Sequence, residues 1–537
     1  MAMASPDAQR SPPESLLAPA GLFNRPPGDM LVHRQQTVKA FMIVEVEQGR
    51  LEGLVKEGVL RFHGVPFAAA PSGARRWRPA EPPQGWSGVR DASRFGAIAP
   101  QLRGAAEALI GGTPGEQSED CLYLNVWTPG TSGKRPVMVW IHGGAFVNGA
   151  GSLGTYNGRR LAARGDMVVV TINYRLGAFS FLNLRDATQQ AIAAGGTEGL
   201  SDQIAALGWV KANIASFGGD PGNVTVFGES AGALSIGALL AMPGARGLFA
   251  KAILQSGATH IGRKRDSSAK IARLFLKKLG TDAAGALAAS RESVLRAQAE
   301  ILKGRSEGGL PFAPTAGGDE LSARAIEGVR QASASGVALL AGTTKEEWKL
   351  FTAARPRLRL MDAARLRDYA ANQVGEDRVD ALLDVYDQRS PFERWNALMT
   401  DRAFAIPAAR LLEAQAPHAP VYAYRFDWRS PLLGGWLGAC HALELGFVFG
   451  TYNIKMAGAF FGGGPEADAL SSAMMDAWIA FARSGDPSTA ALGAWPRYDA
   501  ATRATMIFGD GPPHVAQAPD EARRKAWDSI AEERIGL

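Results

Sequence analysis

The sequence predicts an α/β fold in which helices cover both faces of a mostly parallel central sheet. Two near-continuous apolar runs, Pro136–Ile141 and Met167–Asn173, have the composition of strands that are buried on both faces. A third apolar run, Val224–Phe227, leads through a glycine-rich turn into a segment compatible with a helix. Apolar strands that alternate with helical segments are typical of a parallel sheet with helices on each side.

Other elements follow from local patterns. Alternation and β-branching at Phe41–Val46 and Gly58–Phe62 predict a small N-terminal antiparallel sheet. Residues 260–335 and 352–420 are rich in Ala, Arg and Leu at helical spacing, and we interpret them as helical insertions that build a lid or pocket wall over the site. Further strands are predicted at Leu122–Trp127, Ala250–Gln255 and Val337–Gly342, and further helices at Gly199–Ser216 and Ala469–Ser484.

Composition restricts the class of protein. The 537 residues are 46% hydrophobic and 20% charged, as in ordinary soluble globular proteins, and the net charge of +6 comes from scattered residues, mostly Arg. Without a dense basic run we expect no nucleic-acid partner. No apolar run is long enough for a membrane span, and two cysteines cannot form a disulfide framework. We expect a disordered leader at residues 1–38, one domain at 39–537, a monomer or dimer, and a cytoplasmic location.

The motif Gly228-Glu229-Ser230-Ala231-Gly232 suggests a nucleophilic serine. It follows a predicted strand and opens a predicted helix, the context in which a G-x-S-x-G turn presents its serine hydroxyl to a pocket. Chance matches to so short a pattern are common, and a second one occurs at Gly304–Gly308, around Ser306. Polar, glycine-rich sequence surrounds Ser306 with no strand before it. Only Ser230 therefore has the required context.

A serine nucleophile needs a base and an acid, which in this type of hydrolase follow the serine in the order acid, then histidine. Of the seven histidines, His441 best fits the base, because it lies in a loop after the strand predicted at Val421–Trp428. The acid is expected just after the strand at 337–342, where Glu346 and Glu347 are adjacent. One should point inward and the other should be a solvated surface charge, and the residues alone do not separate them.

The donors for an oxyanion are expected on two turns. Ile141–Phe146 places consecutive small residues directly after a buried strand, which allows backbone N–H groups to approach a reacting carbonyl. The N–H of Ala231, at the start of the next helix, adds a donor that the helix dipole reinforces.

Together these residues resemble the type-B carboxylesterase family of the α/β-hydrolase fold, which includes cholinesterases and p-nitrobenzyl-type esterases. The likeness covers residues 45–510 or so, including Phe62–Ala68, Ser118–Trp127, Asn173–Gly177 and Phe217–Pro221. It implies a serine carboxylesterase that acts through an acyl-enzyme on a small-molecule ester, without cofactor or metal. Alternatives are an amidase or carbamate hydrolase with the same triad, or a non-catalytic adhesion or scaffold protein.

The resemblance also assigns roles to residues. The catalytic acid falls on Glu347, the base on His441 and the oxyanion donors on Gly144, Ala145 and Ala231. A serine that supports the acid falls on Ser256. Ion pairs are implied between Arg76 and Glu119 and between Arg175 and Asp202.

Some positions depart from the family pattern. Trp348 replaces the glycine that follows the catalytic Glu, so either the turn differs or the indole forms part of the gorge wall. Near Pro100-Gln101 the cysteine that usually pairs with Cys121 is missing. Cys121 is therefore expected to be a buried free thiol. Gly317 replaces an aspartate, and Thr197–Gly199 replaces a Gly-Asn-x-Gly pattern.

Overall fold

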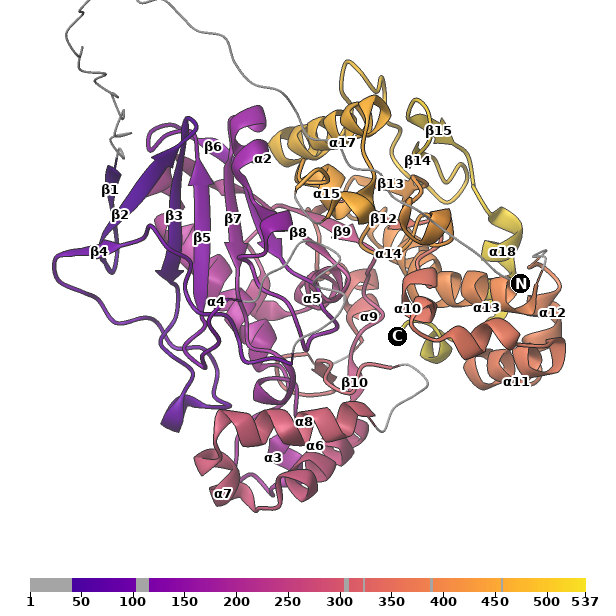
Figure 1. Ribbon diagram of the computed structural model, residues 1–537, viewed down its shortest axis with the longest axis horizontal. Coiled ribbons are helices and arrows are strands. Elements are labelled where there is room, and N and C mark those ends of the chain that lie inside the picture. Colours follow the sequence, from indigo (N-terminus) through magenta and orange to yellow (C-terminus); the bar gives the residue numbers. More distant parts are fainter. Residues whose placement is uncertain (1–40, 103–114, 304–308, 322–323, 387–389, 455–456) are drawn as a thin grey trace, which may run out of the picture. The chain divides into compact units, whose positions relative to one another are not determined.

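A thirteen-stranded sheet runs through the computed structural model, which describes residues 41–102, 115–303, 309–321, 324–386, 390–454 and 457–537 (Figure 1). Its strands lie in the order β1 (Phe41–Val46), β2 (Gly49–Lys56), β3 (Val59–Pro66), β5 (Tyr123–Thr128), β7 (Val168–Ile172), β6 (Arg135–Ile141), β8 (Gly219–Glu229), β9 (Lys251–Gln255), β12 (Ala338–Thr344), β13 (Val421–Phe426), β14 (Thr505–Phe508) and β15 (His514–Ala516), with β4 (Val89–Asp91) beside β2. A separate pair consists of β10 (Arg263–Lys264) and β11 (Thr315–Ala316).

The middle of the large sheet is parallel, as predicted, and its two ends are antiparallel apart from the parallel pairing of β4 with β2. Every pair from β7 through β6, β8, β9, β12 and β13 to β14 is parallel. The predicted N-terminal antiparallel strands are present, but they continue the main sheet through the pairing of β3 with β5 instead of forming a sheet of their own. Strand β2 was not predicted, because its glycines and charges hide the alternation.

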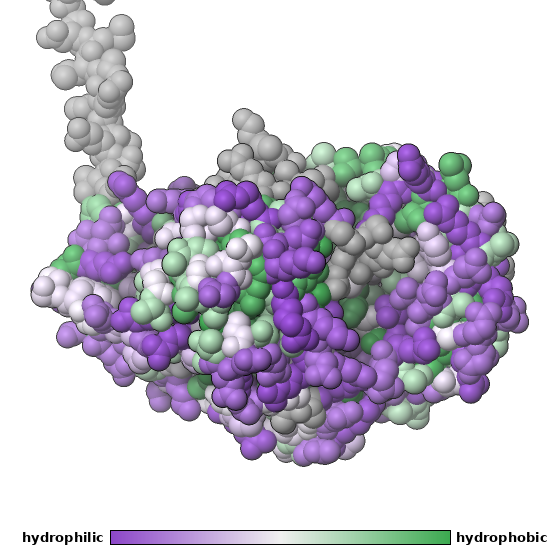
Figure 2. All heavy atoms as spheres, turned by 90° about the horizontal axis from the view of Figure 1, so that it is seen from below, coloured by the Kyte–Doolittle hydropathy of each residue, from purple (hydrophilic) through white to green (hydrophobic). Residues whose placement is uncertain are grey.

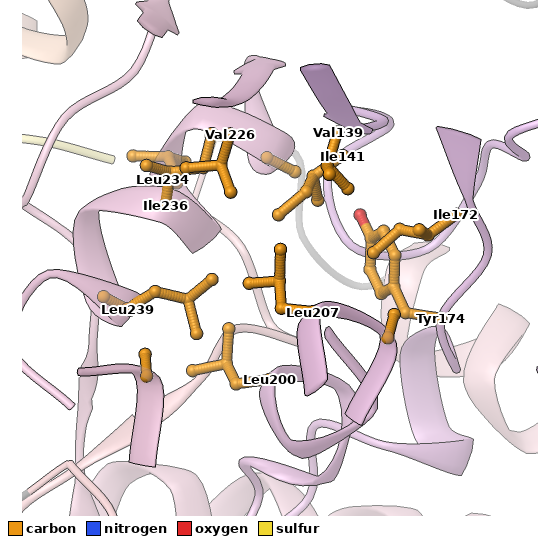
Figure 3. Close-up of a cluster of buried hydrophobic side chains, with 14 of the residues drawn as sticks. Val139, Ile141, Ile172, Tyr174, Leu200, Leu207, Val226, Leu234, Ile236 and Leu239 are labelled. Atoms are coloured by element: carbon orange, nitrogen blue, oxygen red, sulfur yellow. The ribbon is translucent and has the colours of Figure 1, made fainter. Parts of the chain in front are cut away.

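Helices cover both faces of the sheet. Along β6, Val137, Val139 and Ile141 join the apolar cluster that includes α4 (Glu198–Asn213) and α5 (Ala231–Leu239). Their neighbours Met138 and Trp140 join the opposite cluster, with α2 (Arg159–Gly165), α15 (Leu445–Val448) and α17 (Pro465–Ser484). Figure 3 shows the first cluster, in which side chains of β6 and β8 meet those of α4 and α5. Burial on both faces explains the unbroken apolar runs.

The two helical insertions are also present, as two groups in Figure 1. The first contains α6 (Arg265–Leu279), α7 (Ala283–Ala288) and α8 (Arg291–Lys303), which lie together, and α9 (Ala325–Arg330), which packs against α5 instead. The second contains α11 (Ala363–Val374), α12 (Val379–Leu383), α13 (Pro391–Thr400), a π-helical turn at Asp401–Ala405 and α14 (Ile406–Gln415), and packs around an apolar cluster of its own with Trp527 and Ile530. Shorter helices are α3 (Leu184–Ala187), α10 (Lys349–Ala353), α16 (Gly458–Phe461) and α18 (Glu521–Ala526).

The implied ion pairs and the free thiol are confirmed. Arg76 contacts Glu119 at 2.5 Å, and Arg175 binds Asp202 through two guanidinium nitrogens and its backbone N–H, with both side chains buried. Cys121 is free and buried. Residues 1–38 and Ser306 lie outside the described residues.

The surface is mostly hydrophilic on the face drawn in Figure 2, with small hydrophobic areas between the polar ones. Isolated exposed apolar side chains of this kind are normal for a folded protein. Within the described ranges, no helix is both long and apolar enough to cross a membrane.

The buried ion pair of Arg175 and Asp202 is expected to be important for the stability of the fold. Asp202→Ala should lower the free energy of unfolding by about 3–5 kcal/mol, because it leaves the buried guanidinium without its counter-charge. Asp476→Ala, which breaks the half-exposed pair with Arg164, should cost about 1 kcal/mol or less. Equilibrium urea unfolding measures both, and equal losses would contradict the assignment.

Candidate active site

Five neighbouring parallel strands bring the predicted site residues to one edge of the sheet. In the order β6, β8, β9, β12 and β13, all five run in the same direction, so their carboxyl ends meet at that edge. The residues that follow these ends are, in the same order, His142–Ala145, Ser230, Ser256, Glu347 and His441.

Ser230 lies on a strained turn between β8 and α5. Its backbone has φ 54° and ψ −122°, which residues with a Cβ rarely adopt. Its N–H donates to Gln255 O at 2.9 Å. A Cβ at Gly228 would lie 2.7 Å from Ile141 O, and a Cβ at Gly232 would overlap the same oxygen. Both glycines of the motif are therefore required by the close approach of the end of β6.

The structure brings His441 and Glu347 into contact. His441 Nδ1 lies 2.6 Å from Glu347 Oε2, and the other carboxylate oxygen accepts the N–H of Thr344 at 2.8 Å. Glu347 is completely buried, so its charge acts on the imidazole without screening by water. Of the two adjacent carboxylates, Glu347 is the one that points inward.

The other ring nitrogen of His441 reaches the serine turn. Nε2 lies 3.0 Å from Oε1 of Glu229, the residue directly before Ser230. The imidazole therefore spans the space between the end of β12 and the end of β8. Sequence reasoning missed Glu229, because the middle position of G-x-S-x-G carries no signal about which way its side chain points.

Buried carboxylates set the electrostatics of His441. Burial acts to lower the pKa of the imidazole, but the negative charges of Glu229 and Glu347 outweigh burial and raise that pKa well above its ordinary value. A further buried acid, Glu444, bonds to Gln255 Nε2 at 3.1 Å. Burial, and then the charges of Glu229 and Glu347, raise the pKa of Glu444 to about 8. Glu444 therefore binds its proton more tightly than a free carboxylic acid does.

Glu346 differs from the expected solvated charge. Its carboxylate accepts the N–H of Ala439 at 3.0 Å and pairs with Lys349, while its own N–H donates to Ala439 O at 2.9 Å. Gly438 has φ +58°, and a Cβ there would overlap this carboxylate. Glu346 thus holds the loop that carries His441, a role that the sequence could not reveal because the partners are more than 90 positions apart.

The turn after β6 lies directly beside Ser230. A Cβ at Gly143 would lie 3.0 Å from Ser230 Cβ and 2.7 Å from Glu229 O. Gly144 and Ala145 follow with φ +114° and +54°, and Ala231 begins α5 on the other side of the serine. The first N–H groups of a helix have no partner within it. The residues predicted as oxyanion donors therefore flank Ser230.

Ser256 is close to the site but is not bonded to the predicted acid. Its N–H donates to Gly342 O at 2.8 Å, and Gly257 packs against the backbone of Ser230. Among the described residues, its buried Oγ has no hydrogen-bond partner. Support of Glu347 by Ser256 stays a prediction.

Aromatic rings pack against the imidazole of His441. Phe351 and Phe404 lie 5.0 and 4.9 Å from the imidazole, measured between ring centroids, and Trp348 lies 4.9 Å from Phe351. Trp348 has φ −71° and ψ −16°, an ordinary helical conformation, so this turn needs no glycine. The indole of Trp348 therefore packs against Phe351, one of the two rings that contact His441.

No group of three or more His, Cys, Asp or Glu residues in the described part of the chain could hold a metal ion.

Comparison with known proteins agrees with this geometry. The profile of the Carboxylesterase family matches residues 40–527. The chain is 41% identical over 500 residues to a para-nitrobenzyl esterase of Bacillus subtilis (strain 168), covering 91% of this chain and 99% of that protein. It is 35% identical over 489 residues to a phenmedipham hydrolase of Pseudarthrobacter oxydans, covering 88% and 96%.

Solved structures give the same result. A carboxylesterase of Geobacillus stearothermophilus superposes with a TM-score of 0.82 at 40% identity, covering 90% of this chain and all of that one. The fold is accordingly that of the α/β-hydrolases, and the chain is a carboxylic ester hydrolase. It belongs to the carboxylesterase family.

Substitution of the two adjacent carboxylates, Glu347 and Glu346, should affect kcat to very different extents. Glu347→Gln should lower kcat by about 10²- to 10⁴-fold, because the imidazole loses the anion that orients it and stabilises its charged form. Glu346→Gln should change kcat by about threefold or less, because an amide oxygen can still accept the Ala439 N–H. Glu346→Ala, which cannot, should fall between them. Steady-state kinetics on one ester checks the ranking, and a larger loss for Glu346→Gln than for Glu347→Gln would refute it.

The raised pKa of His441 makes a prediction about pH. If the neutral imidazole is the base, kcat/KM should fall as the pH drops through a midpoint above 6.5, because His441 binds its proton more tightly than a free imidazole. Glu229→Gln should move this midpoint down by removing a negative charge beside Nε2. Glu444→Gln should move it less, because Glu444 bonds to Gln255, whereas Glu229 and Glu347 are the charges that raise the pKa of the imidazole. A midpoint that stays fixed or rises in Glu229→Gln would contradict the account.

Proposed function

We propose that the chain hydrolyses small-molecule carboxylic esters through an acyl-enzyme on Ser230. The observation that carries this proposal is the position of His441, with Nδ1 2.6 Å from Glu347 and Nε2 at the turn that bears Ser230. A base oriented by a buried acid, next to a serine on a strained turn, is the arrangement that activates a hydroxyl as a nucleophile.

In the proposed reaction, Ser230 Oγ attacks the ester carbonyl while His441 Nε2 takes its proton. The carbonyl oxygen becomes an oxyanion and accepts hydrogen bonds from the N–H groups of Gly144, Ala145 and Ala231. The alcohol then leaves with the proton from His441. Water, deprotonated by the same imidazole, attacks the acyl-enzyme and releases the carboxylic acid, which restores Ser230.

The aromatic side chains favour esters with a flat or apolar group. Phe351 is 39% exposed although its ring lies 5.0 Å from the imidazole, so it faces both solvent and the reacting groups. Offset or edge contacts between such a ring and an aryl group of the substrate are favourable. We therefore propose short-chain p-nitrophenyl and p-nitrobenzyl esters as good substrates, in line with the name of the para-nitrobenzyl esterase relative. The cytoplasmic location and the monomeric or dimeric state stay predictions.

Covalent labelling tests the proposal. A fluorinated organophosphonate should modify Ser230 and no other serine, with Ser306 as the internal comparison, and Ser230→Ala should lose several orders of magnitude in ester hydrolysis. Peptide mass spectrometry and steady-state rates measure these outcomes. A matched anilide should react far more slowly than the ester in the parent protein. Labelling elsewhere, retained activity in Ser230→Ala, or faster cleavage of the anilide would each contradict the proposal.

A further inference from the structure

A buried glutamine holds the turn that follows β6. Residues 99–102, here called the strap, lie against the end of this turn, and Gln101 is their buried polar side chain. Its Nε2 donates to Gly149 O at 3.0 Å and to Ala99 O at 3.0 Å, while its Oε1 accepts the Gly149 N–H at 2.8 Å. One side chain thus fixes both the N–H and the C=O of Gly149.

Gly149 in turn packs on the first residues of the turn. It has φ +111°, and a Cβ there would overlap Gly143 O and the imidazole of His142. A rotation of the Gly149 peptide would therefore press directly on His142 and Gly143. Because Gly143 also lies beside Ser230, such a shift would change the distance between the oxyanion donors and the nucleophile.

A second contact joins the strap to the same turn. Asn148 Nδ2 donates to Leu102 O, and the Asn148 backbone lies so close to Gly144 that a Cβ on Gly144 would overlap Asn148 O. Gly144 is one of the proposed oxyanion donors. The strap therefore contacts Gly149 and Asn148, and these two residues contact the backbone of residues 142–144.

Hydrogen bonds, and no disulfide, attach the strap to residues 116–118. The N–H of Gln101 donates to Gln117 Oε1 at 3.0 Å, and Ile98 exchanges backbone hydrogen bonds with Glu116 and Ser118. Cys121, just after this segment, is a free thiol. Hydrogen bonds and packing are therefore what hold the strap in place.

From these contacts we infer that Gln101 is a positioning residue for the oxyanion-binding turn. It sets the orientation of Gly149, and through Gly149 the positions of the N–H groups of Gly144 and Ala145 relative to Ser230. The inference rests on the proposed function of that turn. Preorganised donors stabilise the transition state more than the bound ester, so their displacement lowers kcat and leaves KM nearly unchanged.

Replacement of Gln101 by methionine tests this role. Gln101→Met keeps the length of the side chain and removes its hydrogen bonds. We expect kcat to fall about 10- to 100-fold with KM within about threefold, because small displacements of catalytic groups have effects of this size. The inhibition constant of an aryl trifluoromethyl ketone, whose serine adduct carries an oxyanion, should rise by the factor by which kcat/KM falls.

Gln415→Met is the matched control. Gln415 is also fully buried, and its Nε2 also donates to two backbone carbonyls, those of Ala334 and Val337, before the amino end of β12 and thus at the opposite edge of the sheet. It should lower the melting temperature by a similar amount while kcat and ketone inhibition stay at parent values. Equal kinetic losses in both variants, or unchanged kcat in a folded Gln101→Met, would overturn the inference.

Two further measurements cover the case in which Gln101→Met does not fold and the case in which the proposed function is wrong. If Gln101→Met does not fold, Asn148→Ala removes the second contact and should show a smaller fall in kcat with the same constant KM. An unchanged kcat in that variant would also overturn the inference. Inhibition of the parent protein by the ketone tests the proposed function separately, because it requires Ser230 but no variant.

Discussion

The close packing of the end of β6 on the turn around Ser230 is the constraint on which the site depends. Ile141 O approaches Gly228 and Gly232 so closely that neither position has room for a Cβ. A Cβ on Gly143, two residues further along, would lie 3.0 Å from Ser230 Cβ. One contact between two neighbouring parallel strands therefore fixes the nucleophile and the turn proposed to bind the oxyanion relative to each other. The strain at Ser230, with φ 54°, persists because the packing on both sides leaves no other conformation.

The imidazole is positioned from the other half of the sheet. Strands β12 and β13 are adjacent, so Glu347 and His441 lie on neighbouring loops, and the two carboxylates after β12 have different tasks. Glu347 binds the ring, whereas Glu346 binds the backbone of the loop that carries it. Glu229 adds a second negative charge beside the imidazole, at the opposite ring nitrogen. Glu347 and Glu229 together stabilise a protonated imidazole, as needed after it has taken a proton from serine, and they move the working range of the base to higher pH.

Much of this arrangement could be predicted from the sequence. The unbroken apolar runs predicted the parallel strands because burial on both faces demands them, and the strand before Ser230 predicted the turn on which it lies. The likeness to a family, rather than the residues alone, selected Glu347 over Glu346. Features that depend on distant contacts were missed: Glu229 and Glu444 as buried acids, Glu346 as a support, and Gln101 behind the turn. Strand β2 was missed because its pairing with β1 and β3, not its composition, makes it a strand.

A substitution of Gly232 tests the central constraint most directly. Gly232 is helical, so an added methyl group acts through its overlap with backbone atoms at the end of β6, first Ile141 O and then His142 O, which cannot move aside alone. The rate of phosphonylation of Ser230 should fall about 100-fold or more in Gly232→Ala while the protein stays folded, because the serine and the turn after β6 must separate. Gly208→Ala, within α4 where a Cβ meets nothing within 4 Å, should react at the parent rate. Parent-like phosphonylation of Gly232→Ala would show that the contact between β6 and the serine turn does not set the geometry of the site.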